Sequence, residues 1–371
     1  MLRNEPFVLN DHSASRSDPE LHTAGQGAGN TQLPIPGDME QAGWVAWVAA
    51  LRAWIFLALL LVIFESWARY IYHASFILNP FNIQSIAVFT VSPLLLALGQ
   101  TFVVISGGID LSVGFTMGFA AVIVSQVINR TAPSLGEGGS FIVGCLLAIA
   151  FSFIPGLING LLIALLRVPP FIGTLGMYGV ARGTAYLLAG GTTVPVTNGF
   201  LNFLGNGTIL GFPVVVLVTI LLVVLMQYFL TQQKFGQHVY AIGGNRQAAV
   251  RAGINVPRNT IAIYILSSLC AAVGGILYTA RFSAGAAQAG EPLLLDSIAA
   301  VVIGGASLFG GSGTIVGTVI GALIIAVIQY GLVFVNVEPF WQFVAVGVVI
   351  VISVLVDQSQ RRLGGERVNE E

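Results

Sequence analysis

Charge is what this sequence most lacks. Of its 371 residues, 8% are Asp, Glu, Lys or Arg, whereas 56% are apolar. A soluble domain carries about 25% charged residues. The shortage of charge excludes an ordinary water-soluble enzyme, a nucleic-acid-binding protein and a disordered scaffold.

Residue types that bind metals or catalyse reactions are also scarce. The chain has one lysine, Lys234, which does not belong to a G-x-x-x-x-G-K-[ST] loop, so ATP is not bound in that way. The sequence has no H-E-x-x-H or C-x-x-C motif, and its four histidines do not form a metal-binding pattern. The two cysteines, Cys145 and Cys270, lie in apolar stretches, as small core residues do. We therefore expect no catalytic residue, metal or cofactor on this chain.

The sequence contains several long segments without a charged residue. Residues 70–109, 183–233 and 297–337 contain no Asp, Glu, Lys or Arg. A helix that spans a bilayer needs about 20 mostly apolar residues, so each segment holds two spans or a span plus a loop. We predict an all-α polytopic integral membrane protein with about ten transmembrane helices. They are expected at residues 46–66, 84–105, 112–129, 141–166, 170–189, 210–230, 260–281, 297–309, 314–334 and 339–357.

The eighth predicted span is short. Its end reads SLFGGSG, and glycine disfavours a continuous helix. We therefore expect a partial or broken helix near residues 297–313.

The remaining charge indicates the domain boundaries and the topology. Residues 1–43 carry six carboxylates and two arginines among Gly, Ser, Thr and Pro, a composition that predicts a disordered tail. The membrane domain is expected over 44–357, and a second tail over 358–371. Ten spans place both termini on one side, where nine lysines and arginines fall against three on the other. The positive-inside rule then predicts cytoplasmic termini and a cytoplasmic loop at 231–259.

That loop contains a predicted short helix at residues 246–252. Asn245 precedes the helix and is a favoured N-cap residue, and Gly253 suits the position after its C-terminus. The other candidate residues are two glycines that can turn the chain and two small residues that the helix would expose to a partner: Gly243, Gly244, Ala248 and Ala249. The alternative interpretation is a solvated connector without a partner.

Four segments resemble one known family. Residues 240–254 (YAIGGNRQAAVRAGI) look like the coupling loop of sugar permeases from bacterial ABC importers. Three further segments carry the same resemblance: SGGIDLSVG at 106–114, PPFIGTLGMYGVARG at 169–183 and VIGGASLFGGSGTIVGTVIGALIIAVIQYGL at 302–332. The similarity covers roughly residues 76–357. The motif residues to which we assign structural roles are Gly107, Gly108, Asp110, Gly304, Gly305, Gly310, Gly311 and Gly317.

The resemblance implies a division of labour among several chains. Two permease subunits form the pathway in the lipid bilayer of the plasma (inner) membrane, and two ABC ATPase subunits on the cytoplasmic face hold ATP and Mg²⁺. A periplasmic or extracellular binding protein delivers the sugar. The helix at 246–252 would insert into the ATPase and transmit its closure. We therefore interpret the chain as the permease subunit of a monosaccharide importer, for a pentose or a hexose, acting as a homodimer or with a similar permease.

Ionisable residues within the predicted spans are few. Arg182 lies inside the fifth span, and an unpaired charge in lipid is costly, so we expect it to face the interior of the subunit. Asp110 precedes the third span, which is typical of a carboxylate that caps a helix. A direct role of Asp110 in coupling or gating is the alternative.

Uncharged polar residues within the spans are candidates for the translocation pathway, because a sugar needs hydrogen-bond partners but no counter-charge. These residues are Gln100, Gln126, Asn159 and Gln329. Each can equally bond a neighbouring helix. Two other functions stay open: an ABC permease for another small solute, such as a nucleoside, a branched amino acid or a sugar-like signal, and a secondary carrier that works without an ATPase.

Overall fold

The computed structural model describes the backbone of residues 36–338 and 340–363, and the side chains of residues 51–338 and 340–355. The chain forms two compact units, Met1–Val48 and Ala49–Glu371, and the core lies within the second. Most of the predicted N-terminal tail, and residues 364–371 of the predicted C-terminal tail, lie outside the described residues.

Each of the ten predicted spans corresponds to helical structure. Eight spans are separate helices: α1 (Pro36–Tyr72), α2 (Pro80–Ile105), α4 (Pro170–Ala189), α6 (Val214–Thr231), α9 (Val256–Phe282), α10 (Leu293–Ile303), α11 (Ile315–Phe334) and α12 (Phe340–Leu363). The other two spans lie in α3 (Val113–Ala164), which is kinked at Gly136, where φ is 67°. Within the described residues, six helices are long and apolar enough to cross a membrane, namely α1, α2, α3, α6, α9 and α11. The prediction of an all-α polytopic membrane protein is confirmed.

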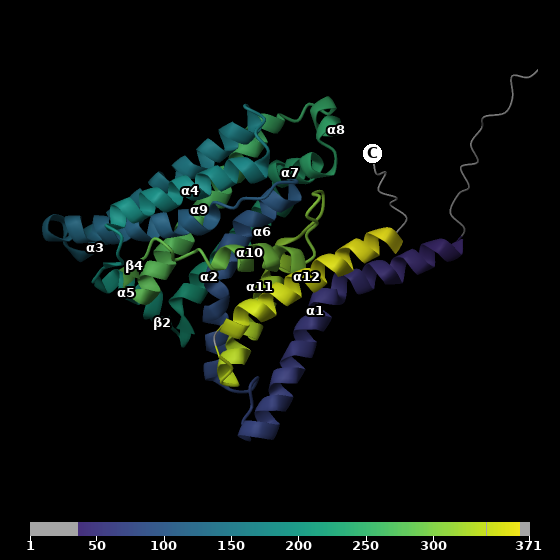
Figure 1. The fold of residues 1–371 in the computed structure, drawn as a ribbon, viewed down its shortest axis with the longest axis horizontal. Helices are drawn as coiled ribbons and strands as arrows, with labels where there is room; N and C mark the ends of the chain where they lie inside the picture. Colours follow the sequence, from purple (N-terminus) through teal and green to yellow (C-terminus); the bar gives the residue numbers. More distant parts are fainter. Residues whose placement is uncertain (1–35, 339, 364–371) are drawn as a thin grey trace, which may run out of the picture. The chain divides into compact units, whose positions relative to one another are not determined.

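Short elements connect the long helices. They are α5 (Gly199–Asn206), α7 (Lys234–Gly244), α8 (Arg246–Arg251) and four two-residue strands: β1 (Val194–Pro195), β2 (Thr208–Ile209), β3 (Phe212–Pro213) and β4 (Ala284–Gly285). Strand β1 pairs with β4 and β2 pairs with β3, both antiparallel. Helices α7 and α8 lie at one end of the long helices, and the β2–β3 hairpin lies at the other (Figure 1).

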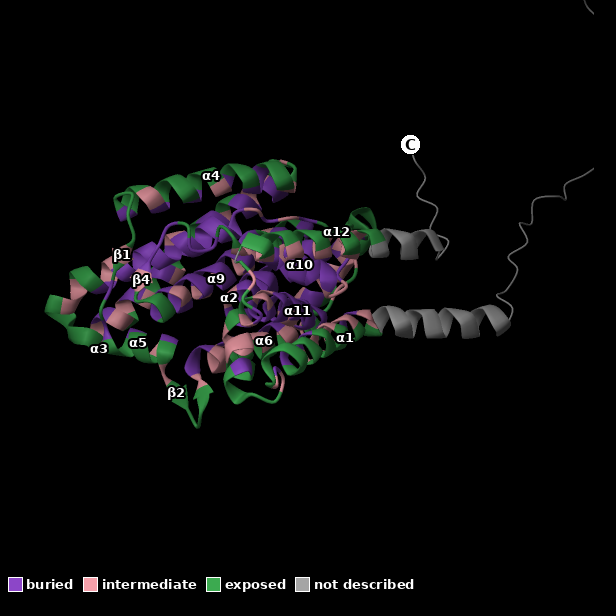
Figure 2. Ribbon diagram, turned by 60° about the horizontal axis from the view of Figure 1, so that its bottom comes forward, coloured by how far each residue is buried: buried purple, intermediate pink, exposed green. Residues whose placement is uncertain are grey.

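The helices separate into a buried group and an outer group. The most apolar segment of α2 is 83% buried, and those of α9 and α11 are 67% and 72% buried, whereas that of α1 is 17% buried. Figure 2 shows the buried residues concentrated on α2, α9, α10 and α11, with α4 largely exposed. Helix α4 packs mainly on α3. The inner helices therefore carry the core, and the outer ones present apolar surface to their surroundings.

Glycine permits the closest contacts between the inner helices. A Cβ atom at Gly156 of α3 would lie 2.6 Å from the carbonyl oxygen of Tyr264 and 2.7 Å from the Cα of Ile265, both on α9. One turn later, a Cβ at Gly160 would lie 2.7 Å from the Cα of Ile261. Small residues at such spacing let helix backbones approach closely in membranes. Gly156 and Gly160, four residues apart on α3, therefore form a close contact with α9.

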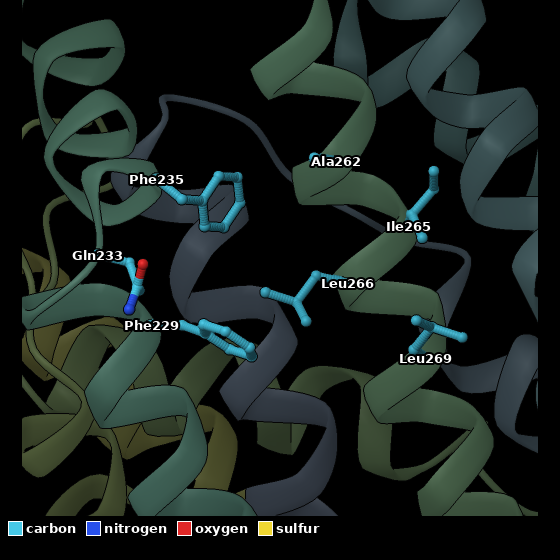
Figure 3. Close-up of a pocket in the computed structure, with 7 residues that line it drawn as sticks. All are labelled: Phe229, Gln233, Phe235, Ala262, Ile265, Leu266 and Leu269. Atoms are coloured by element: carbon cyan, nitrogen blue, oxygen red, sulfur yellow. The ribbon is translucent and has the colours of Figure 1, made fainter.

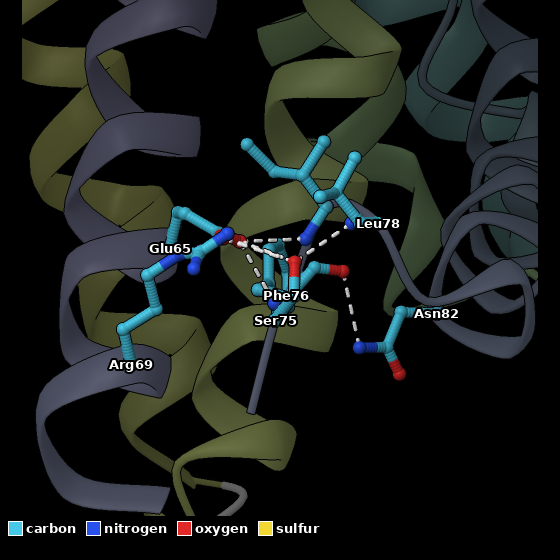
Figure 4. Close-up of polar contacts among 7 residues, drawn as sticks. Glu65, Arg69, Ser75, Phe76, Leu78 and Asn82 are labelled. Carbon is cyan, nitrogen blue, oxygen red and sulfur yellow. Dashed lines mark hydrogen bonds and ion pairs between the residues drawn. The ribbon is translucent and has the colours of Figure 1, made fainter. Parts of the chain in front are cut away.

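A carboxylate on α1 fixes the connection to α2. One oxygen of Glu65 accepts hydrogen bonds from the backbone N–H groups of Phe76 and Ile77, each at 2.8 Å, and the other accepts from Ser75 Oγ at 2.9 Å (Figure 4). Arg69, one turn along α1, donates to the same side chain at 2.6 Å. The carboxylate thereby satisfies backbone donors of a segment that has left the helix.

The contact between α3 and α9 predicts a difference between two glycine substitutions. Gly156→Ala forces the two backbones apart and should lower the free energy of unfolding by about 1–3 kcal/mol. Gly347→Ala on α12 is the matched control, because no heavy atom lies within 4 Å of its Cβ position, and alanine favours a helix by up to about 1 kcal/mol. Thermal unfolding in detergent measures both variants. Equal melting temperatures would contradict the tight contact.

Candidate functional site

Helix α8 begins at a side-chain cap. Asn245 has an extended backbone, with φ −156°, and its Oδ1 accepts a hydrogen bond from the N–H of Ala248 at 2.9 Å. This is the usual geometry of an N-cap, which satisfies a donor that the first helical turn leaves free. The predicted start of the helix is confirmed.

The helix ends in a Schellman motif at Gly253. The N–H of Gly253 donates to the carbonyl of Val250 at 3.0 Å, and the N–H of Ile254 donates to that of Ala249 at 3.1 Å. Gly253 has φ +80°, a conformation in which glycine is not strained. Both ends of α8 are thus specified by local sequence, and the helix is a defined unit between α7 and α9.

The expectation that α8 exposes both of its alanines is wrong for Ala249. Its side chain is 3% exposed and packs with Ile242 of α7 and Val256 of α9. A two-turn helix needs such an apolar contact to stay in place. Ala248 and Val250 are exposed, and they, together with charged residues of the same helix, form the surface that a partner can reach.

Gly243 brings α7 against the end of α2. A Cβ atom at this position would overlap the carbonyl oxygen of Ile105 and would lie 2.6 Å from the backbone nitrogen of Gly311. The N–H of Gly311 donates to the same Ile105 carbonyl at 2.8 Å. Gly244 is exposed, but it also lies close to the loop: a Cβ atom at Gly311 would be 3.1 Å from the Cα of Gly244. Three backbone segments therefore meet at this point.

The third segment is the α10–α11 loop, residues 304–314. Helix α10 ends at Ile303, and the loop residues with positive φ are Gly305, Gly310, Gly311 and Gly313. The predicted break near residues 297–313 is therefore observed, and α10 is a short helix of 11 residues. Tyr240 of α7 donates from its hydroxyl to the carbonyl of Gly313 at 2.6 Å, a second link between α7 and this loop.

The other motif glycines lie at close contacts around the same region. Gly304 and Gly317 face each other so closely that a methyl group on either would overlap the backbone of the other, which packs α11 on the end of α10. A Cβ at Gly310 would lie 3.1 Å from the Cα of Gly107, and one at Gly305 would lie 3.4 Å from the Arg52 guanidinium. Gly108 packs against the hydroxyl of Tyr264 on α9.

Asp110 does not cap α3. The N-cap residue is Ser112, and Asp110 Oδ1 accepts from the Ser112 N–H at 2.9 Å and from its Oγ at 2.6 Å. Asp110 Oδ2 accepts from Ser267 of α9 at 2.8 Å. Full burial in the segment between α2 and α3 raises the pKa of Asp110, against the opposing effect of these hydrogen bonds. The carboxylate connects the α2–α3 segment to α9, the helix that follows α8.

The four amides predicted for a pathway each bond a neighbouring segment of the chain. Gln100 is fully buried and holds the Asp110 backbone, donating to its carbonyl at 2.5 Å. Asn159, also fully buried, donates to Ser112 Oγ at 2.9 Å. The remaining two bonds run from Gln126 to the Leu188 carbonyl and from Gln329 to Asp296, the latter at 2.8 Å. These contacts match the helix-bonding alternative, and a pathway role for the amides stays a prediction.

Arg182 does not face the interior of the subunit. It is exposed on α4, with its guanidinium carbon 5.3 Å from the centre of the Phe115 ring. A cation over an aromatic face is stabilised electrostatically. The ring partner explains how the side chain is positioned without a carboxylate.

A cavity of about 350 Å³ lies between α6, α7 and α9. Figure 3 shows its lining, which consists of six apolar side chains and one amide, Gln233, at the edge beside Phe229 and Phe235. Ligand sites use a few convergent polar groups to fix orientation. A single amide does not meet the hydrogen-bonding needs of a sugar, so this cavity is not a sugar site.

Sequence reasoning missed two contacts of this region. Tyr240 lies inside the coupling-loop motif, so its position was visible, but its bond to Gly313 joins residues 73 apart in sequence. Ser267 lies 157 residues from Asp110, and nothing around it distinguishes it from other small residues of an apolar helix.

Comparison with known proteins identifies related chains. A family described as "Branched-chain amino acid transport system / permease component" matches residues 82–354. The ribose import permease protein RbsC of Bacillus subtilis (strain 168) is 40% identical over 285 residues, which are 76% of this chain and 86% of the relative. The fructose import permease protein FrcC of Rhizobium meliloti is 38% identical, with 71% and 74% coverage. The galactose/methyl galactoside import permease protein MglC of Escherichia coli (strain K12) is 34% identical, with 76% and 87% coverage. No solved structure matched the chain.

The cap of α8 generates a testable prediction. Asn245→Ala removes the acceptor for the Ala248 N–H and should destabilise α8 by about 1 kcal/mol, so that its amides exchange about fivefold faster. Gln247→Ala, at an exposed position of the same helix, is the control and should leave exchange unchanged. Hydrogen exchange followed by mass spectrometry over residues 246–251 distinguishes them. The cap assignment fails if both variants exchange alike.

Proposed function

The chain belongs to the permease-component family of ABC importers, and from that premise we propose that it carries a monosaccharide inward across the plasma membrane. Each of the three sugar import permeases described above aligns with more than two thirds of this chain. The ATPase chemistry belongs to separate subunits, and a solute-binding protein delivers the sugar. Alternating access is the expected mechanism, in which closure of the ATPases changes the side that the pathway faces.

The substrate class rests on those relatives and on charge. The relatives are named for ribose, fructose and galactose, whereas the family description names branched-chain amino acids. An amino acid carries two charges and needs counter-charges along its route, which are expensive inside a bilayer. The described residues of the long helices carry few ionised groups. A neutral sugar fits that composition, and we propose a pentose or a hexose.

The observation that carries the coupling role is the position of α8. It is a capped helix that projects from one end of the fold, and its neighbour α7 contacts both the end of α2 and the α10–α11 loop. Helix α9 follows α8 directly and reaches Asp110 through Ser267. We assign Gly243, Gly244, Asn245, Ala248 and Gly253 to coupling with the ATPase, with Ala249 as the residue that holds α8 in place. Movement of α8 would reach three membrane segments at once.

The distribution of basic residues supports cytoplasmic termini. Arg52 lies beside Gly305 in the α10–α11 loop, and Arg167 shares a hollow with Arg246 of α8, so these arginines lie at the α8 end. Arg281, in contrast, bonds Asn206 of α5. Positive charge favours the cytoplasmic side, which agrees with docking of an ATPase on α8.

A second permease subunit is proposed to cover α4. Three glycines of its exposed face, at positions 176, 179 and 183, have no heavy atom within 4 Å of their Cβ positions, and Arg182 is exposed on the same helix. A guanidinium in lipid is costly, and small residues suit close helix packing. A second copy of the chain, with the pathway between the copies, satisfies both conditions.

The coupling role predicts the effect of a proline at Gly253. Proline fixes φ near −65° and has no N–H, so it excludes the φ of +80° and the bond to Val250. Gly253→Pro, or deletion of residues 245–252, should abolish ATP-driven monosaccharide uptake into proteoliposomes while membrane insertion persists. Gly211→Pro in the β2–β3 turn, where φ is +82°, is the matched control and should retain uptake. Full uptake by an inserted Gly253→Pro variant would refute the assignment.

A further inference from the structure

A hollow of about 430 Å³ lies beside α8, between the end of α3, the start of α4 and the start of α9. Two arginines line it from different elements, Arg167 in the α3–α4 turn and Arg246 at the start of α8. The other lining residues are apolar and include Val250, Pro169 and Pro257, all three of which are exposed. Two guanidiniums that line one hollow attract an anion more strongly than either of them does alone.

Neither arginine has an anionic partner in the part of the chain that the structure describes. The sequence explains this, because residues 138–290 contain no Asp or Glu at all. The same stretch contains seven basic residues: Arg167, Arg182, Lys234, Arg246, Arg251, Arg258 and Arg281. The segments that build the hollow therefore bring positive charge only, and an anion that binds there has to come from another part of the chain or from a partner.

The α3–α4 turn holds Arg167 in a fixed place. Arg167 has φ +57°, which is uncommon for a residue with a side chain. Pro169 and Pro170 follow it, and proline restricts both its own φ and the residue before it. These restrictions limit the backbone of the turn, which keeps Arg167 at the edge of the hollow, three residues before α4.

We propose that this hollow receives an acidic side chain of the ATPase subunit, so that the ATPase binds the α3–α4 turn as well as α8. The proposal rests on the proposed function, which places an ATPase against α8. Two guanidiniums offer parallel N–H donors that match a carboxylate. Arg246 and Val250 belong to the helix that docks on the ATPase, so the hollow opens next to that partner. This favours an ATPase carboxylate over the phosphate of an anionic lipid.

The second contact gives the ATPase its own route into the membrane domain. Through α7, α8 reaches α2 and the α10–α11 loop, whereas Arg167 is three residues before α4. Helix α4 carries Arg182 and the exposed glycines that we assign to the subunit interface. Movement of the ATPase would therefore act on α4 directly and not only through α8.

Charge reversal in the complex with the ATPase tests the proposal. Arg167→Glu and Arg246→Glu should each weaken ATPase binding by about tenfold or more. Because both arginines bind one carboxylate, the double variant should lose less affinity than the product of the two single effects. Lys234→Glu, an equal charge change at an exposed position of α7 outside the hollow, is the control and should bind nearly as the wild type does. Binding is measured in detergent over a range of salt concentrations.

A photoreactive amino acid at position 167 identifies the occupant. Crosslinking to the ATPase is the expected result, and crosslinking to phospholipid alone would overturn the proposal, as would wild-type affinity in both arginine variants. A different result would refute the proposed function itself, namely that the unmodified permease binds no ATPase and transports without ATP. An effect of Lys234→Glu as large as that of Arg167→Glu would show a diffuse charge effect and would also overturn the proposal.

Discussion

The structure depends on one backbone contact, at which the end of α2, the end of α7 and the α10–α11 loop come together. The carbonyl of Ile105 accepts from the N–H of Gly311, and Gly243 lies directly against both groups. Any side chain at Gly243 would separate the three segments, so the contact requires glycine. Because α8 follows α7 after a single residue, a force on α8 acts through this contact on two membrane helices. We propose that this contact is the mechanical link between α8 and the membrane core.

Charged residues in the core and at the α8 end have different surroundings. Inside the core, the carboxylate of Asp110 is fully enclosed and satisfied by hydroxyl and backbone donors of Ser112 and Ser267. At the α8 end, basic residues lie without acidic neighbours over a long stretch of sequence. A permease driven by ATP on other chains needs no ion relay of its own, and it needs a surface on which those chains dock. Both features agree with the family to which the chain belongs.

The features that depend on neighbouring residues in the chain were predicted from the sequence. The apolar segments predicted where the long helices lie, SLFGGSG predicted the break after α10, and Asn245 and Gly253 predicted both ends of α8. The sequence could not predict which helix faces pack against each other. The burial of Ala249, the exposure of Arg182 and the bond between Asp110 and Ser267 depend on packing between distant segments. For the same reason, the sequence left open whether the amides Gln100 and Asn159 line a pathway or bond a neighbouring helix, and in the structure each holds the segment that leads into α3.

The most direct test of the central claim is sugar uptake by the reconstituted importer. Proteoliposomes would contain the permease with or without its ATPase, with ATP inside and the sugar-loaded binding protein outside. We predict uptake of a labelled monosaccharide only when the ATPase and ATP are both present, with competition by other monosaccharides and none by leucine. Uptake by the permease alone, driven by an ion gradient, would contradict the claim and establish a secondary carrier.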